Sequence, residues 1–299
     1  LAQGKGDIWD SGKIESDASQ WIAYQGKPLK RNARYYWKVK VYTNRGEAEW
    51  SAPAFWSMGL LNEADWQGQW IGLDRAASGD SETQWSRLAA RYLRKEFALS
   101  KEVKRATVHI AGMGLYELFI NGQRIGDQVL APAPTDYRKT ILYNTYDVTP
   151  QLRKENAIGV TLGNGRFYTM RQNYKPYKIP TFGYPKLRLN LIVEYMDGSK
   201  ETIATNTSWK LTTEGAIRSN NEYDGEEYDA RKELGNWTQS GYDDKSWIAA
   251  QRVSIPSGTL RAQIMPGMKV MDTLKPVSIQ KLGDKYILDF GQNMAGWVR

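Results

Sequence analysis

Short segments in which apolar and polar residues alternate recur along the chain, and this alternation is typical of half-buried β-strands. The clearest example, residues 116–120, runs into Asn121-Gly122, and Ile125 resumes the apolar pattern on the far side. Because Asn and Gly tolerate the positive φ angles of a type I′ turn, this stretch predicts a β-hairpin. Helical periodicity is weak, and only residues 149–154 indicate a short helical turn. The pattern therefore predicts an all-β protein.

The central part of the chain, residues 62–256, is predicted to be a β-sandwich of the jelly-roll type, because many short strands follow one another with turn residues between them. The expected strands are Ala90–Phe97, Arg105–Ala111, Leu115–Ile120, Ile141–Val148, Asn156–Leu162, Lys186–Tyr195, Thr202–Ala204 and Ser208–Thr212. Asp197-Gly198 supplies a second hairpin turn.

Residues 1–61 predict part of a fibronectin type III-like module. Residues 36–42 alternate strictly, which predicts one strand with Trp37, Val39 and Val41 on a common, buried face. The chain is expected to begin inside this module. An incomplete sandwich of this kind would expose strand edges.

Two further segments flank the central domain. Residues 60–70 have the composition of a linker, in which Trp66 and Trp70 are expected to pack the neighbouring domains together. Residues 257–299 form the other segment, because the character of the sequence changes again from Leu260.

Composition excludes several classes of function. The net charge of +8 raises nucleic acid as a partner, but the basic residues are mostly interleaved with acids, as in residues 101–105, so we predict a solvated basic surface and no nucleic-acid partner. The absence of cysteine excludes disulfides and thiolate metal sites, and the single histidine, His109, excludes a histidine-rich zinc site. No apolar run approaches the roughly 18–20 residues needed to span a membrane.

Residues 116–148, Leu162-Gly163-Asn164-Gly165 and residues 224–231 (DGEEYDAR), in this order, closely resemble the N-terminal region of bacterial α-L-rhamnosidases, glycoside hydrolase family 78. The resemblance implies an intact enzyme that hydrolyses terminal α-L-rhamnosyl groups of glycans or glycosides by inversion. Residues 286–298 resemble the opening of the β-domain that precedes the family's catalytic barrel, so residues 257–299 are expected to be the beginning of that domain and to include one or two of its strands. The family's acidic catalytic residues lie in an (α/α)6 barrel, which would follow Arg299. No segment here matches the family's Arg-Asp-Glu catalytic motif, so this chain alone is predicted to be inactive.

The same resemblance implies the partners of the chain. These are a rhamnose-containing glycan and the remainder of the same polypeptide, and a periplasmic or secreted location is favoured over the cytoplasm. Some members of the family bind rhamnose through the corresponding jelly roll with calcium, so Ca²⁺ is the one cofactor to be considered. A purely structural buttress for the barrel is the alternative function.

The sharpest acidic cluster lies in residues 224–229. In an extended segment Asp224 and Glu226 would share one face, where their carboxylates could accept hydrogen bonds from sugar hydroxyls. Three interpretations remain open: a pair of glycosidase carboxylates, a calcium site that includes Asp229, and a structural salt bridge to Arg231.

A second candidate set is formed by Asp136, Tyr137 and Asn164, which fall in predicted loops. An acid, an aromatic ring and an amide are the groups that clamp a sugar by hydrogen bonds and stacking. Asn164 stands between two glycines, which indicates left-handed geometry or a close backbone approach. The alternative is an Asx-turn at Asp136 together with aromatic residues that belong to the core. Asp136, Tyr137, Asn164, Asp224 and Glu226 thus form the predicted ligand-binding set.

Overall fold

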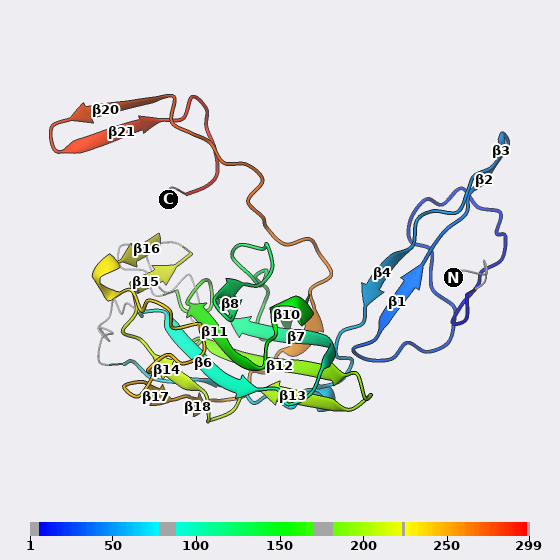
Figure 1. Cartoon of the computed structure of the whole chain (residues 1–299). Helices are drawn as coiled ribbons and strands as arrows, with labels where there is room; N and C mark the ends of the chain where they lie inside the picture. The colour runs from blue at the N-terminus through cyan, green and yellow to red at the C-terminus, as the bar shows by residue number, and fades with distance from the viewer. Residues whose placement is uncertain (1–5, 78–87, 170–181, 223–224, 298–299) are drawn as a thin grey trace.

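A β-sandwich of two sheets forms the body of the protein (Figure 1). The computed structural model describes residues 6–77, 88–169, 182–222 and 225–297. The 7-stranded sheet has the order β18-β5-β12-β7-β10-β19, with β13 also paired to β12. Its strands are β5 (Ile71–Gly72), β7 (Val103–Met113), β10 (Thr140–Asp147), β12 (Lys186–Tyr195), β13 (Lys200–Ala204), β18 (Gln251–Arg252) and β19 (Thr259–Ala262).

The 6-stranded sheet has the order β17-β14-β6-β11-β8-β9. Its strands are β6 (Arg91–Ala98), β8 (Leu115–Ile120), β9 (Gln123–Arg124), β11 (Glu155–Gly163), β14 (Lys210–Thr212) and β17 (Ile248–Ala249). Neighbouring strands in both sheets are antiparallel except β10 and β19, which run parallel. The all-β prediction is confirmed.

The main core lies between the two sheets. It joins residues of the first sheet, such as Ile110 and Leu189, to residues of the second, such as Leu118 and Val160, all of them at most 1% exposed. Burying a side chain of this size contributes about 1.5–3 kcal/mol to stability. The alternation of inward and outward residues therefore holds each strand in its register, because a slip of one residue would turn the apolar face outward.

The predicted strands of the sandwich are found, and β8 and β12 have the predicted bounds. The others differ by a residue or two at their ends. The predicted hairpin turn has φ angles of 51° at Asn121 and 81° at Gly122. The predicted helical turn is the 3-10 helix η2 (Thr149–Gln151).

The prediction of one continuous strand over residues 36–42 is wrong. Strand β1 (Arg34–Trp37), paired with β4 (Ala54–Ser57), ends at Trp37, and β2 (Tyr42–Thr43), paired with β3 (Gly46–Glu47), is separate. Trp37, Val39 and Val41 are 46%, 47% and 51% exposed. Alternation buries one face of a strand only where a second layer covers it, and no described strand does so here.

Hydrogen bonds join the N-terminal residues to the sandwich. Asn32 is buried, its Oδ1 lies 3.1 Å from Nε2 of His109, and its carbonyl accepts from the guanidinium of Arg105. Trp66 and Trp70, at 7% and 4% exposure, are buried beside this junction, after the 3-10 helix η1 (Glu63–Asp65). The expectation that both tryptophans pack the neighbouring domains together stays a prediction.

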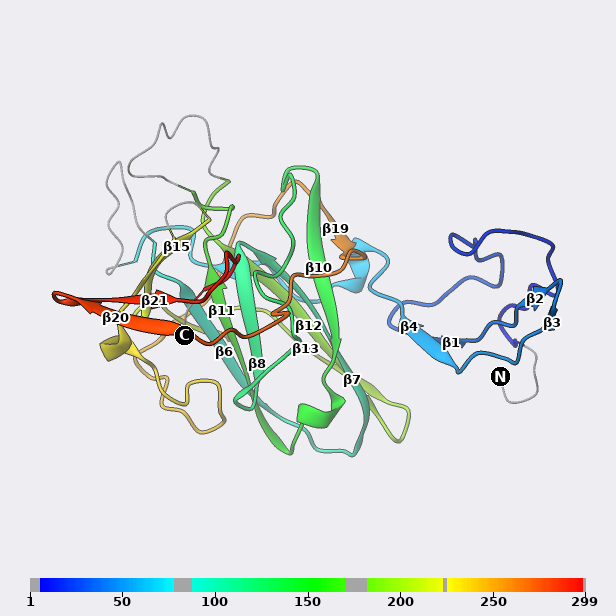
Figure 2. The ribbon, with the colours of Figure 1, turned by 90° about the horizontal axis from the view of Figure 1, so that it is seen from above.

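Beyond the sandwich, a hairpin of β20 (Ser278–Leu282) and β21 (Lys285–Asp289) stands away from the two sheets (Figure 1), and in the view from above it lies in front of the sandwich (Figure 2). Strand β19 lies within the predicted last domain yet pairs with β10 of the sandwich. The domain boundaries at 61/62 and 256/257 stay predictions. In the described part of the chain, no helix has the length and apolarity that a membrane crossing requires.

Candidate functional site

Three loop regions meet at one end of the sandwich. They are the segment that leads into β10, the loop that follows β11, and the hairpin of β15 (Ile217–Asn221) and β16 (Gly225–Tyr228). The Tyr137 ring packs edge-on against Phe167 with 5.2 Å between ring centroids, and the backbone N–H of Asn164 donates to Oδ1 of Asn220 at 2.6 Å. The structure thus brings Tyr137, Asn164 and the hairpin that carries Glu226 to one loop end.

Tyr137 is a core residue of this end. Its side chain is 4% exposed and contacts the rings of Phe167 and Phe182 edge-on, each with 5.2 Å between centroids. Burial raises the pKa of the Tyr137 hydroxyl to about 12. The ring face is covered by protein, as the core-aromatic alternative expected.

Asn164 is also buried, at 2% exposure. Its Nδ2 donates to the carbonyl of Leu88 at 2.8 Å, and its own carbonyl accepts from the N–H of Phe167 at 3.0 Å. Its Oδ1 is buried and has no hydrogen-bond partner among the described residues. The left-handed residue of this loop is Gly165, with φ 50°, so the glycine and not the asparagine makes the turn.

Asp136 makes the Asx-turn that was predicted as an alternative role. Its Oδ1 accepts from the backbone N–H of Arg138 at 3.2 Å, and the Arg138 guanidinium lies 3.0 Å from the same oxygen. The hydrogen bond from Arg138 lowers the pKa of Asp136. The residue is half-buried, and its second oxygen, Oδ2, accepts from Nη2 of Arg138 at 3.3 Å.

Asp229 forms the structural salt bridge that was one of its three interpretations. It precedes the 3-10 helix η4 (Ala230–Lys232), accepts from the N–H of Arg231 at 3.1 Å and pairs with the Arg231 guanidinium at 2.7 Å. This pairing lowers the pKa of Asp229 to about 2.

The described residues do not fit a calcium site. Among them, no three His, Asp or Glu side chains are grouped so as to hold a metal ion. A cation at Asp229 would have to displace Arg231, and Ca²⁺ takes 6–8 oxygen ligands. The candidate ligand Asp224 lies outside the described residues. No calcium-dependent step is derived from these contacts.

Glu226 is exposed on strand β16, opposite Asn220 of β15. Partial burial of its carboxyl group and, to a lesser degree, the negative charge of Glu117 raise its pKa. Glu226 is therefore the predicted carboxylate whose pKa moves in the direction that a general acid needs. Its neighbour Glu117 is paired with Arg124 at 3.1 Å.

An ion pair at this end was not predicted from the sequence. Nε and Nη2 of Arg166 contact the two carboxylate oxygens of Glu222 at 2.6 and 2.8 Å, and both side chains are partly exposed. This two-point geometry fixes the loop after β11 against the β15–β16 hairpin. Periodicity in the sequence does not relate positions so far apart. The only indications of this pair were the opposite charges of the two residues and their positions in predicted loops.

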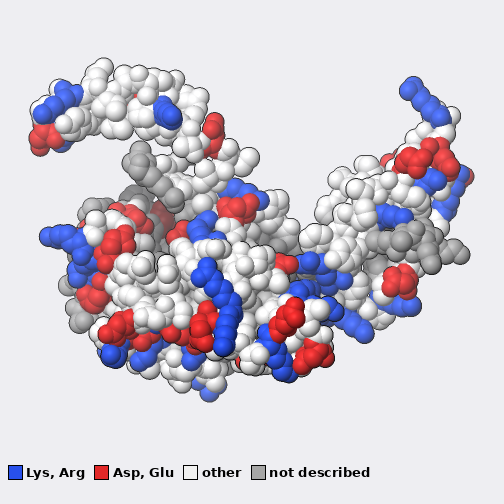
Figure 3. All heavy atoms as spheres, viewed as in Figure 1, with Lys and Arg blue, Asp and Glu red and all other residues white. Residues whose placement is uncertain are grey.

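Charge is mixed over the rest of the molecule. On the face seen in Figure 3, basic and acidic side chains are interspersed over the central sandwich. This distribution agrees with the interleaving of the two charges along the sequence.

A two-sheet sandwich with polar loops at one end places the central part of the chain in the class of β-sandwich domains, which includes lectin domains. Comparison with known protein families identifies the family within this class. Residues 101–272 match the family model of the alpha-L-rhamnosidase N-terminal domain, and residues 1–62 match that of the Rha78A-like, N-terminal immunoglobulin domain. The chain belongs to the α-L-rhamnosidase N-terminal domain family.

Other α-L-rhamnosidases are similar to this chain along nearly its whole length. An alpha-L-rhamnosidase of Formosa agariphila is 40% identical over 320 residues, which cover 100% of this chain and 33% of that protein. One of Alteromonas sp. (strain LOR) is 34% identical, covering 97% and 32%. The structure of the alpha-L-rhamnosidase from Dictyoglumus thermophilum has a TM-score of 0.85 at 40% identity, covering 98% of this chain and 33% of that one. The chain spans about a third of the length of these relatives.

Proposed function

We propose that this chain supplies non-catalytic β-domains of an α-L-rhamnosidase that hydrolyses terminal α-L-rhamnosyl groups of glycans or glycosides. The observation that carries this proposal is the family match over residues 101–272, supported by relatives that align with almost the entire chain. The remainder of the same polypeptide is the partner that would contribute the catalytic barrel.

The pKa values and the ion pairs of the carboxylates at the loop end support the proposal that this chain is non-catalytic. A glycosidase needs one carboxyl group with a raised pKa and a second carboxylate about 5–9.5 Å away, depending on the stereochemical outcome. Asp136 and Asp229 are held by arginines that lower their pKa values, so neither retains a proton near neutral pH. Glu226 has the raised pKa, but its carboxylate neighbour Glu117 is already engaged by Arg124.

The loop end of the sandwich is proposed to bind rhamnose weakly. Glu226 is exposed and Asp136 is half-buried, and their carboxylates would accept hydrogen bonds from sugar hydroxyls. Tyr137 and Asn164, which are buried, would act by holding the loops in place. The C6 methyl group of rhamnose would add about 1 kcal/mol through a small apolar contact. Such a shallow surface gives an affinity no tighter than about 0.1–1 mM.

A purely structural role is the second candidate. It is favoured by the burial of Tyr137 and Asn164, which turn their polar groups and ring faces toward other parts of the protein. In this case the sandwich would only support the barrel.

Hydrolysis is tested with a chromogenic α-L-rhamnoside. The chain is expected to release no aglycone at any pH at which it is folded. If it releases aglycone and the release disappears in Glu226→Gln, the loop carboxylates are catalytic and the proposal of a non-catalytic chain is wrong.

Binding is tested by calorimetry or chemical-shift mapping with L-rhamnose, with calcium present and again after chelation. Asp136→Ala and Glu226→Ala are each expected to weaken binding. Glu155→Ala, an exposed acid at the opposite end of β11, is the matched control and should leave binding unchanged. No response to tens of millimolar rhamnose would leave the structural role as the function of the domain.

A further inference from the structure

A hollow of about 440 Å³ lies at the end of the sandwich away from the proposed rhamnose site. It is lined where β6 leads into β7 and where β10 leads into β11. The register of β6 and β11 pairs Ala98 with Glu155 at this end and Arg91 with Leu162 at the other. Eight residues of strand separate the two ends by about 25 Å, so one small sugar cannot occupy both. The volume lies within the roughly 300–1,000 Å³ typical of ligand sites.

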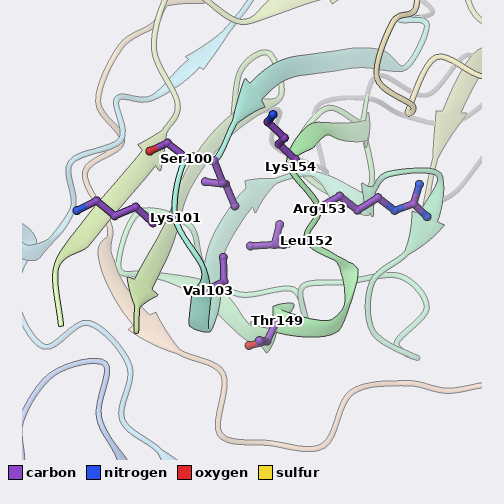
Figure 4. Close-up of a pocket in the computed structure, with 8 residues that line it drawn as sticks. Ser100, Lys101, Val103, Thr149, Leu152, Arg153 and Lys154 are labelled. Carbon is purple, nitrogen blue, oxygen red and sulfur yellow. The ribbon is translucent and has the colours of Figure 1, made fainter. Parts of the chain in front are cut away.

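The hollow combines an apolar floor with a basic rim. Leu99, Val103 and Leu152 supply the floor, and Lys101, Arg153 and Lys154 stand around it. In Figure 4 the side chains of Val103 and Leu152 occupy the middle of the hollow, and the three long basic side chains extend from its edge. We name this feature, lined also by Ser100 and Thr149, the basic hollow.

Two of its three cations are available for a ligand. Lys101 pairs with Asp197 at 2.8 Å. Arg153 and Lys154 are exposed, and neither has an ion pair within the described residues. No Asp or Glu lines the basic hollow, so the unpaired charges favour an anion there.

Buried amides hold the wall that carries these cations. Oδ1 of Asn156, which is 0% exposed, accepts from the N–H of Arg153 at 2.8 Å, and its Nδ2 donates to the carbonyl of Arg153 at 2.6 Å. Asn121 donates from Nδ2 to the carbonyl of Gln151 at 2.8 Å. The backbone N–H of Leu99 donates to the carbonyl of Lys154 at 2.9 Å, which ties the two sides together. A wall fixed in this way loses little entropy when a ligand binds.

We propose that the basic hollow binds an anionic saccharide, a sugar that carries a carboxylate or a sulfate ester. The planar Arg153 guanidinium matches two oxygens of either group, and Lys154 adds a second positive charge. The floor of Leu99, Val103 and Leu152 accepts the C–H face of the sugar ring. The lining includes no aromatic ring, which disfavours a nucleotide, whose base would be expected to stack.

Titration of the whole chain by calorimetry or chemical-shift mapping tests this site. The probes are glucuronate, galactose 6-sulfate, neutral galactose, inorganic sulfate and AMP. At least one of the two anionic sugars is expected to bind with a dissociation constant of about a millimolar, and galactose is expected not to bind. The separate titrations decide whether a carboxylate or a sulfate ester is preferred.

Variants locate the interaction. Arg153→Gln/Lys154→Gln is expected to weaken binding of the anionic sugar about tenfold, because two exposed charge pairs are removed. Lys281→Gln/Lys285→Gln, on the distant β20–β21 hairpin, changes the net charge equally and should bind as the unmodified chain does.

Four results would overturn the proposal. They are the absence of any response to anionic sugars at about 50 mM, unchanged affinity in Arg153→Gln/Lys154→Gln, equal affinity for inorganic sulfate and the sulfated sugar, and tighter binding of AMP. The third result would mean that the floor contributes nothing, and the fourth would indicate a nucleotide site.

Discussion

The buried imidazole of His109 is expected to make the stability of the protein depend on pH well above the range in which carboxylates titrate. His109 is 0% exposed, and burial, with a smaller contribution from the positive charge of Arg105, lowers its pKa to about 4 from an ordinary value of 6.5. Its ring nitrogens contact Oγ1 of Thr145 at 2.9 Å and Oδ1 of Asn32 at 3.1 Å, which holds the imidazole at the junction with the N-terminal residues, away from water.

The sign and size of the change in the free energy of unfolding follow from the difference between the His109 pKa values of the folded and unfolded states. Above pH 6.5 the imidazole is neutral in the folded and unfolded states, and its contribution is fully present. As the pH falls from 6.5 toward 4, only the unfolded chain takes up the proton, and the free energy of unfolding decreases by about 1.4 kcal/mol per pH unit. The contribution of His109 is therefore reduced by about 2 kcal/mol at pH 5 and by about 3 kcal/mol once the pH has fallen through 4.

Two measurements test this reasoning. Because His109 is the single histidine, its Hε1 resonance is unambiguous and should not titrate above pH 5. Denaturant unfolding followed by tryptophan fluorescence should show that the unmodified chain loses about 2 kcal/mol between pH 7 and pH 5, and that His109→Gln does not. A titration midpoint near 6.5, or equal losses in the two proteins, would refute the argument.

Three substitutions should report on the packing of the sandwich by the same unfolding measurement. Arg94→Met is expected to lower the free energy of unfolding by about 3–5 kcal/mol, because Arg94 is 1% exposed and its removal leaves two carboxylates and two carbonyls without their donor. A decrease below about 1 kcal/mol would contradict this role. Gly114→Ala should destabilise more than Gly198→Ala: both have positive φ, but only the Cβ at position 114 would lie 2.1 Å from a backbone carbonyl oxygen, and equal effects would count against the close approach. Trp209→Ala, at 0% exposure, should cost about 3–5 kcal/mol, whereas Trp21→Ala, at 92%, should be nearly neutral; similar losses would be unexpected.

Local patterns in the sequence were sufficient for most strands of the sandwich, whereas β5, β17, β18 and β19 were not predicted from them. The bounds of β8 and β12 and the Asn121-Gly122 hairpin follow from alternation and turn chemistry, which act between neighbouring residues. The same alternation was misleading at Trp37, because a strand buries a face only where another layer covers it. A local pattern of alternation predicts a strand, but it does not show whether a second layer of structure covers one face of that strand.

The candidate site shows the same division. Sequence motifs indicated the family and the loops that carry Asp136 and Glu226, and the Asx-turn at Asp136 follows from neighbouring residues. The burial of Tyr137 and Asn164 did not follow, because it depends on contacts between segments that are far apart in sequence.

Long-range pairing was decided by the tertiary structure. The ion pair of Arg166 with Glu222, the parallel alignment of β19 with β10 and the contact of Asn32 with His109 each join distant segments. Each depends on where two sheets place their loops and edges once the shared core has formed. Most strands and turns of the sandwich could be predicted from the sequence, since they result from short-range dihedral and burial preferences. The folded structure determines which polar groups make internal contacts. It also leaves others, such as Arg153 and Lys154, exposed without an ion pair within the described residues.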